Sequence, residues 1–236
     1  MSWTIERRGR IAVVTMNTNP VNAQNRAFFA DLHDAFDRLE RDHAECPVVL
    51  TGVGARFSAG LDLGEHFRLF AGDTDKVAEW FLDYRATNMR LFTYPRPTVA
   101  AVNGHAFAGG LITAAVCDRT VGAAGDARFG INEVNIGIPM PAVYLRMLTY
   151  AWGQPVASRT CLQGEIFSVD EATRWEFCTR SCRRKKCSTG PWRSPTSPPK
   201  IASTTTPTPR RRCRPPPCAT SRSCPTRSTA ANSRPG

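Results

Sequence analysis

The residues best suited to chemistry lie in two loops of small residues and in one later block that carries a single carboxylate. The first loop lies within residues 54–63, the second lies within residues 103–115, and the carboxylate is Glu133. Small residues allow a ligand to approach the backbone closely, and free main-chain N–H groups at a helix start favour a developing negative charge. The first loop alone is equally consistent with a tight turn, and the alternative interpretation of Glu133 is a structural carboxylate at a helix start.

The residue types and their spacing in the sequence exclude several other kinds of site. The second loop lacks the G-x-G-x-x-G pattern of a dinucleotide-binding turn and the Lys-Ser/Thr of a P-loop, so phosphate binding by those routes is not expected. Residues 178–236 contain six cysteines but no C-x2-C pair, and no histidine follows Cys178, so no metal site is predicted there. Cys46, Cys117 and Cys161 stand in apolar stretches, which predicts buried free thiols.

The segments that must position these loops alternate between short β-rich runs and helical patterns, which indicates an α/β domain. Residues 11–16 read as a strand, and residues 25–42 carry apolar side chains on one face at helical spacing. Residues 48–52 and 98–102 read as buried strands, each of which delivers the chain to a glycine-containing loop. Asp62 stands where its side chain can cap a helix that begins directly after it.

Together the two loops resemble the signature of the crotonase (enoyl-CoA hydratase/isomerase) superfamily, F-S-A-G-x-D-L followed further along the chain by N-G-x-x-x-x-G-G. Both motifs are intact here, and residues 128–139 resemble the third block of that family. The resemblance covers Met1 to Phe177. It implies an α/β fold with the crotonase-type ββα spiral core, in which the family's C-terminal helices are missing and a tail takes their place.

The resemblance also implies roles for individual residues. The backbone N–H groups of Leu61 and Gly109 are expected to form an oxyanion hole for a thioester carbonyl, so that an enolate can form beside it. The residues expected to bind the acyl-CoA substrate are Ala23, Ala59, Gly60, Asp62 and Gly110. No metal and no separate cofactor are expected, because coenzyme A is part of the substrate.

Glu133 decides which reaction the resemblance implies. Hydratases of this family carry a catalytic carboxylate at two positions, because adding water needs two groups to position the water and manage its protons. Here the first position holds Ile112 and the second holds Glu133. A single carboxylate can still move a proton from C2 to C4, so the resemblance implies a Δ3,Δ2-enoyl-CoA isomerase of fatty acid β-oxidation. Hydration, thioester hydrolysis and an inactive acyl-CoA-binding remnant stay open as alternatives.

The remaining candidates are assigned to pocket lining, surface or packing. His105, in the second loop, is predicted to line the pocket without taking part in the chemistry. His33, His43 and His66 lie in helical or charged contexts and are predicted to lie at the surface. The apolar residues of 78–92 are predicted to form a helix that either covers the acyl chain or packs in the core.

The composition changes abruptly after Phe177. Residues 178–236 carry 14 Lys and Arg, no Asp or Glu and 11 of the 18 prolines, whereas residues 1–177 carry 17 basic and 20 acidic residues. The net charge of +11 therefore comes from this segment, which contains Trp192 as its single aromatic residue, so nucleic-acid binding is not expected. Such a composition cannot bury enough apolar surface to fold, so disorder is expected.

A frameshift near codon 177 explains this tail better than selection for a basic arm, because one out-of-frame reading of GC-rich codons for residues 177–192 gives an amphipathic sequence. Two parts are expected, a catalytic domain over 1–177 and a basic tail over 178–236. The family implies a homotrimer or hexamer, which loss of the C-terminal helices is expected to weaken. The sequence has no signal-peptide pattern and no run of 18 apolar residues, so a cytoplasmic protein without a membrane segment is expected.

Overall fold

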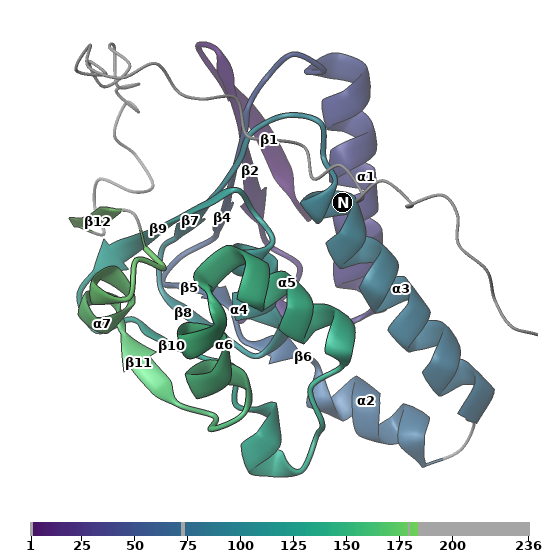
Figure 1. Ribbon diagram of the computed structural model, residues 1–236. Helices are drawn as coiled ribbons and strands as arrows, with labels where there is room; N and C mark the ends of the chain where they lie inside the picture. Colours follow the sequence, from purple (N-terminus) through teal and green to yellow (C-terminus); the bar gives the residue numbers. More distant parts are fainter. Residues whose placement is uncertain (1, 72–73, 179, 184–236) are drawn as a thin grey trace, which may run out of the picture. The chain divides into compact units, whose positions relative to one another are not determined.

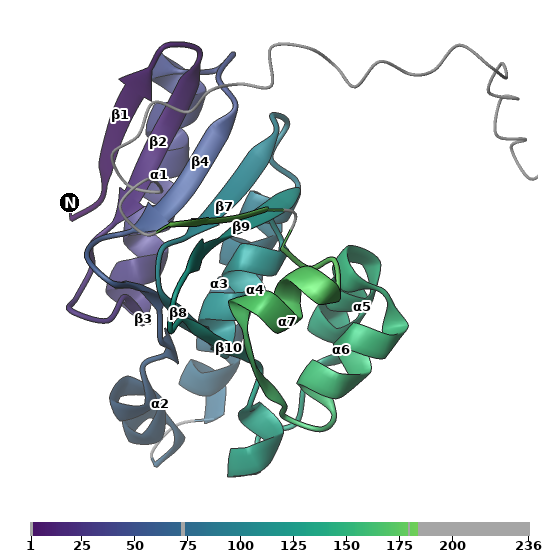
Figure 2. The same ribbon diagram turned by 90° about the vertical axis from the view of Figure 1, so that its left-hand side faces the viewer.

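Two β-sheets and a two-stranded ladder form the framework of the protein, with helices packed against them (Figure 1, Figure 2). The computed structural model describes residues 2–71, 74–178 and 180–183. These residues belong to one of the two units into which the chain divides, Met1–Trp192. No helix within the described ranges is both long enough and apolar enough to cross a membrane.

The larger sheet has six strands that are parallel apart from the first. In spatial order they are β1 (Thr4–Arg8), β2 (Ile11–Met16), β4 (Val48–Gly52), β7 (Thr98–Val102), β9 (Arg119–Ala124) and β12 (Arg180–Arg183). β1 and β2 pair antiparallel, and each later pair of neighbours is parallel. The central strands β4 and β7 are built from small and β-branched residues because both of their faces are covered.

A smaller sheet and a two-stranded ladder connect the large sheet to the glycine loops. The smaller sheet has the order β11 (Ile166–Ser168), β10 (Arg128–Gly130), β8 (His105–Phe107) and β5 (Arg56–Ser58), and the ladder joins β3 (Ala23–Gln24) to β6 (Gly60–Leu61). β4, β7 and β9 of the large sheet lead in turn to β5, β8 and β10 of the smaller sheet, and helices follow. This alternation is the ββα spiral that the resemblance implied, and the prediction of an α/β fold is confirmed.

Seven α-helices and one 3₁₀-helix complete the described ranges. They are α1 (Arg26–Asp42), α2 (Leu63–Phe70), α3 (Thr74–Phe92), α4 (Gly109–Ala115), η1 (Glu133–Ile136), α5 (Ala142–Trp152), α6 (Gln154–Cys161) and α7 (Val169–Arg174). The predicted first helix is confirmed: Asn25 is its N-cap, and its side chain accepts a hydrogen bond from the Phe28 N–H at 3.0 Å. α1 and α3 lie side by side (Figure 1).

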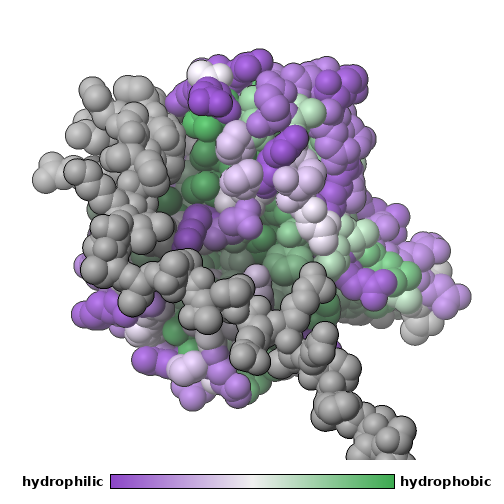
Figure 3. Space-filling model, turned by 45° about the horizontal axis from the view of Figure 1, so that its top comes forward, coloured by the Kyte–Doolittle hydropathy of each residue, from purple (hydrophilic) through white to green (hydrophobic). Residues whose placement is uncertain are grey.

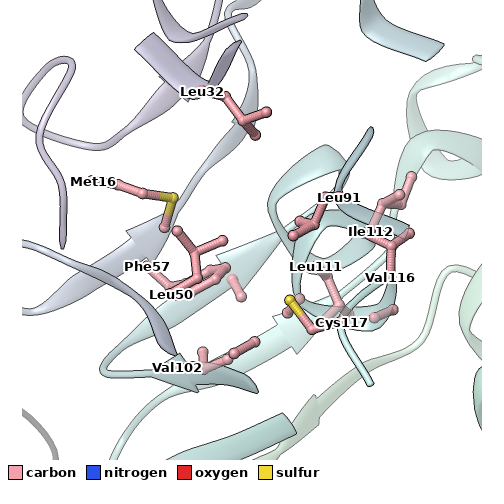
Figure 4. Packing of buried hydrophobic residues seen from close by; sticks show 14 of the residues in the cluster. Met16, Leu32, Leu50, Phe57, Leu91, Val102, Leu111, Ile112, Val116 and Cys117 are labelled. Carbon is pink, nitrogen blue, oxygen red and sulfur yellow. The ribbon is translucent and has the colours of Figure 1, made fainter. Parts of the chain in front are cut away.

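The hydrophobic core lies between the strands and α1, α3 and α4. Met16, Leu50 and Phe57, from β2, β4 and β5, lie close together, and Leu111 and Ile112 of α4 lie across from them (Figure 4). The three body cysteines are buried free thiols, as predicted, and Cys178 is a fourth. The surface is mixed: on the face shown in Figure 3, hydrophobic residues lie among hydrophilic ones. Phe57 of the first loop and Leu111 and Ile112 of α4 belong to this core, so the core holds both glycine loops in place.

The predicted surface position of His66 is wrong. His66 is 2% exposed, and its ring packs edge-on against Trp80 at 4.6 Å and Phe81 at 5.4 Å. Because α2 is only eight residues long, its sequence pattern did not show which of its faces packs against α3. His33 and His43 are half-buried rather than fully exposed, and His33 lies 3.2 Å from the Thr87 hydroxyl.

The predicted helix over 78–92 is confirmed as part of α3, although its residues divide between core and solvent. Leu91 is fully buried, while Leu82 is 53% exposed. The helix packs against α1, α2 and α4. Its role as a cover for an acyl chain stays a prediction.

The described structure continues a few residues past the predicted boundary at Phe177. Cys178 is buried, and Arg180–Arg183 form β12, which pairs parallel with β9 at the edge of the large sheet. Strand pairing uses main-chain groups, so a polar sequence can supply an edge strand. The predicted disordered tail otherwise falls at residues 184–236, which lie outside the described residues, and the division into domains stays a prediction.

Candidate active site

A cavity of about 350 Å³ lies where the two glycine loops and η1 meet. Its lining is mostly apolar and includes one carboxylate: Ala59, Leu61, Leu63, Phe107, Ala108, Asn132, Glu133, Ile136 and Ile138. The predicted residues Ala59, Leu61 and Glu133 are thus brought together from segments more than 70 positions apart in the chain. A cavity with apolar walls and one polar group suits a small ligand that must be oriented.

The first loop reaches the cavity through Gly60 and Leu61, which form β6. Gly60 has φ of +85°, a conformation that glycine adopts without steric cost, and Leu61 follows it in β6. β6 pairs in parallel with β3, so that Ala23 lies beside Gly60 and Gln24 beside Leu61. The predicted substrate residue Ala23 therefore supports the loop from the side.

Two buried asparagines hold this loop in place. The Asn103 side chain accepts a hydrogen bond from the Gly52 N–H at 3.1 Å and donates to the carbonyls of Gly52 and Gly54 at 2.8 and 2.9 Å. The Asn22 amide donates to the carbonyls of Met16 and Phe57 at 3.2 and 3.1 Å. These bonds satisfy loop carbonyls that are shielded from water.

The second loop meets the first at the start of α4. A Cβ added to Gly60 would lie 2.7 Å from the Phe107 carbonyl and 3.0 Å from the Gly109 nitrogen, and one added to Gly110 would lie 2.4 Å from the Ser58 carbonyl. Only glycine allows such an approach at these positions. Gly109 is the first residue of α4, so its N–H has no acceptor within the helix.

Ala108 precedes α4 in a strained conformation, with φ of +49° and ψ of −128°. Such backbone strain in a residue with a side chain costs about 1 to 3 kcal/mol and persists only where the surroundings impose it. The Ala108 N–H donates to the Gly130 carbonyl at 2.7 Å, which ties the loop to β10. Ala108 itself lines the cavity, so this strained residue lies at the edge of the site.

Glu133 is the first residue of η1, and its carboxyl is largely buried. The residue is 7% exposed, and its Oε2 atom has no hydrogen-bond partner among the described residues. Burial raises the pKa of Glu133 to about 7, and a hydrogen bond from its own backbone N–H opposes the rise. A carboxyl with a pKa near neutrality can both accept and return a proton, which suits a general acid and base.

Other predicted residues take supporting positions. The Asp62 side chain caps α2 by accepting a hydrogen bond from the Glu65 N–H at 3.1 Å, as its position predicted, and it does not line the cavity. Ile112 is buried within α4 and does not line the cavity. The predicted pocket position of His105 is wrong, because His105 does not line the cavity; its Nδ1 accepts a hydrogen bond from the Arg128 N–H at 3.1 Å.

Three polar residues near the site escaped the sequence analysis. Gln24 donates to the Gly109 carbonyl at 3.2 Å and to the Thr113 hydroxyl at 2.8 Å, which fixes the first turn of α4. Tyr84 and Tyr144 are buried and pack against each other, with ring centroids 5.2 Å apart, and neither lines the cavity. Their spacing gives no local signal, because α3 and α5 reach the site only through the fold.

The arrangement is suited to proton transfer beside a carbonyl group. Loop backbone and one buried carboxylate share a cavity, and within the described ranges no group of three or more His, Cys, Asp or Glu side chains is placed to hold a metal ion. Two roles stay predictions. One is the donation of hydrogen bonds from Leu61 and Gly109 to a substrate oxygen. The other is the binding of substrate by Ala23, Gly60, Asp62 and Gly110.

Comparison with known proteins gives one family throughout. The model of the family described as enoyl-CoA hydratase/isomerase matches residues 6–185. The chain is 39% identical over 173 residues to a Thermus thermophilus protein assigned as an enoyl-CoA hydratase, covering 70% of this chain and 65% of that protein. It is 35% identical over 182 residues to the hydroxycinnamoyl-CoA hydratase-lyase of Pseudomonas fluorescens, covering 75% and 65%.

A solved structure agrees with this placement. The crystal structure of an enoyl-CoA hydratase/carnithine racemase from Magnetospirillum magneticum is similar with a TM-score of 0.72 and 28% identity, covering 79% of this chain and 70% of that one. The chain spans just under two thirds of the length of the curated relatives named above. Since the family model matches well over half of the sequence, the chain belongs to the enoyl-CoA hydratase/isomerase family of the crotonase superfamily.

Proposed function

We propose that this protein binds an unsaturated acyl-CoA thioester and shifts the double bond of a 3-enoyl-CoA to the 2-position. The observation that carries the proposal is the placement of Glu133 in one cavity with Leu61 and beside the Gly109 loop. It is supported by the buried state of this carboxyl and by the pKa of about 7 that burial gives it.

In the proposed reaction the Glu133 carboxylate removes a proton from C2 of the substrate. The C–H bond electrons move into the conjugated system, and negative charge develops on the thioester oxygen, where the N–H groups of Leu61 and Gly109 would stabilise it. One such donor contributes about 3 to 4 kcal/mol in comparable sites. Glu133 then returns the proton to C4, which leaves the double bond between C2 and C3.

No oxidant or reductant takes part in this sequence, because one proton leaves and one proton returns. The scheme therefore needs only the substrate, whose coenzyme A moiety serves for binding. The carboxyl must be ionised to begin the reaction and protonated to end it, and a pKa near neutrality makes both states accessible.

Hydration of a 2-enoyl-CoA is the second candidate, and the names of the relatives favour it. The Thermus thermophilus protein and the short-chain-enoyl-CoA hydratase of Clostridium acetobutylicum, 31% identical to this chain, are both named for hydration. Isomerisation ranks first because a single carboxylate lines the described cavity. Binding of acyl-CoA without turnover is the outcome if neither reaction is observed.

The test is conversion of a 3-enoyl-CoA to the conjugated 2-enoyl-CoA, followed by ultraviolet absorbance, with the full chain and its Glu133→Gln variant. Glu79→Gln, an exposed carboxylate on α3, is the matched control. We expect turnover in the full chain and the control, and a loss of about 100-fold or more in Glu133→Gln. Equal turnover in Glu133→Gln would remove Glu133 as the acid and base.

A further inference from the structure

The cavity has a second polar side chain, which the isomerisation scheme does not use. Of the residues that line it, only Asn132 and Glu133 have polar side chains, and the rest are Ala, Leu, Ile or Phe. Asn132 directly precedes Glu133 in the chain and is half-buried. Since Glu133 carries the proton in the proposed reaction, Asn132 is the polar group of the cavity that still lacks a role.

The side-chain amide of Asn132 has no partner within the described part of the protein. Asparagine at a helix N-cap commonly accepts a hydrogen bond from a nearby backbone N–H, as Asn25 does for α1. Asn132 is the N-cap of η1 but makes no such bond, and its amide forms no other hydrogen bond to a described residue. An asparagine amide offers both N–H donors and an acceptor oxygen. These groups are therefore available to a molecule that enters the cavity.

An amide in an apolar wall makes the cavity selective. When a hydrocarbon chain fills the cavity, it displaces water from the amide and offers no hydrogen bond in return, which is costly. A ligand that carries a hydroxyl group replaces the displaced water, because a hydroxyl both donates and accepts. Sites that hydrogen-bond a ligand hydroxyl discriminate against the analogue without it for this reason.

The place of Asn132 in the chain indicates which carbon of the ligand carries the hydroxyl. Consecutive Cα atoms lie about 3.8 Å apart, and Asn132 and Glu133 line the same cavity. In the proposed function Glu133 exchanges protons with C2 and C4 of the acyl chain. The carbon between these two is C3, so a hydroxyl on C3 lies nearest to both side chains.

We propose that the Asn132 amide binds a hydroxyl group on C3 of the acyl chain and thereby gives the cavity a preference for 3-hydroxyacyl-CoA over the saturated acyl-CoA. This specificity role rests on the acyl-CoA site of the proposed function. It adds to that site a group that isomerisation leaves idle, and its ligand is the product of the second candidate reaction, hydration of a 2-enoyl-CoA.

The test measures the binding of butanoyl-CoA and of 3-hydroxybutanoyl-CoA by calorimetry. The full chain is compared with Asn132→Leu, which is similar in size but cannot hydrogen-bond, and with Asn132→Ala, which removes the amide without adding bulk. We expect the full chain to bind the hydroxylated ligand about fivefold more tightly than the saturated one, and both variants to lose this preference. The affinity of Asn132→Leu for butanoyl-CoA is expected to be unchanged or higher, because no amide is then desolvated.

Asn135→Ala is the matched control. Asn135 lies on the same short helix, is exposed and does not line the cavity, and its amide donates to the Gly164 carbonyl at 3.1 Å. Its removal disturbs η1 without removing a polar group from the cavity, so the control is expected to keep the preference of the unaltered chain. If Asn132 only supported η1, its variants would instead weaken the binding of both ligands equally.

Inhibition of isomerisation gives a second measure. The inhibition constant of 3-hydroxybutanoyl-CoA is expected to rise about fivefold in Asn132→Leu, while kcat stays within about twofold of the unaltered value. The two values separate because the proton passes through Glu133 alone, whereas the inhibitor also uses the amide.

The two levels of the proposal fail differently. If the full chain binds neither ligand, the acyl-CoA site fails and the role of Asn132 fails with it. If both ligands bind but no isomerisation is observed, the proposed reaction fails, and the binding preference still decides the role of Asn132. If the full chain shows no preference, or if the Asn132 variants keep it, the acyl-CoA site stands and only the role of Asn132 is overturned.

Discussion

Gly60 and Gly109 approach so closely that a Cβ on Gly60 would lie 3.0 Å from the Gly109 nitrogen. This contact joins two loops that follow different strands and sets the backbone of both at the edge of one cavity. The two glycines are therefore required for a geometric reason, whatever ligand the cavity binds.

Replacing Gly60 with alanine is expected to lower the free energy of unfolding by about 3 kcal/mol, from the positive φ and from contacts with the Phe107 carbonyl and the Ala108 Cβ. Gly9→Ala is the control, since Gly9 has φ of +63° with open space around it, and its cost is expected to be about 1 kcal/mol. Denaturant unfolding measures both. Equal losses in the two variants would show that the loops can separate at little cost.

Isomerase activity is expected to depend on pH through Glu133. The carboxyl must be ionised to accept the C2 proton, and its pKa is raised to about 7 by burial. The value of kcat/KM is therefore expected to rise as the pH increases toward 7 and to level off above it. A profile that is flat from about pH 5 to pH 8 would indicate that another group removes the proton.

The same shift predicts a stability change with a defined sign. The folded-state pKa of Glu133 lies above its ordinary value, so its protonated form stabilises the fold at low pH, and this contribution is lost as the pH rises to about 7. Glu133→Gln removes the charge and is expected to be more stable than the unaltered chain at about pH 8, by on the order of 3 kcal/mol. The difference should shrink toward zero at about pH 4, as measured by urea unfolding. A constant difference across this range would show that Glu133 does not titrate as described.

Substitutions at Asp62 can separate its role as the N-cap of α2 from any contact that its carboxylate makes with substrate. Asp62→Ala removes the hydrogen bond to the Glu65 N–H and is expected to cost about 1 kcal/mol of stability. Asp62→Ser keeps a capping oxygen and is expected to restore both the stability and the affinity for acyl-CoA. Restored stability with affinity still weakened several-fold would mean that the carboxylate itself contacts the ligand.

The order and type of the main elements could be predicted from local pattern. Residues 11–16, 48–52 and 98–102 form strands, and residues 26–42 form a helix, because apolar periodicity and capping residues act over short distances. The glycine loops and Glu133 could be singled out in the same way, since small residues and an isolated carboxylate are visible in the sequence itself.

The tertiary structure decided which of these residues meet and which others join them. His66 was expected at the surface and is buried against Trp80, and His105 was expected in the pocket and bonds to the Arg128 backbone. Tyr84 and Tyr144 gave no local signal, although their rings pack together with centroids 5.2 Å apart. Side-chain environment depends on contacts between distant elements, and neither spacing nor propensity encodes those contacts.

The sequence alone thus determined the loops, the carboxylate, the strands that carry them and the abrupt change of composition after Phe177. Only the fold decided that Glu133 is buried in the cavity beside Leu61 and that Gly60 touches the Gly109 loop. The physical reason is that burial raises the pKa of Glu133 and leaves polar atoms without water, and burial is a property of packed neighbours rather than of residue order.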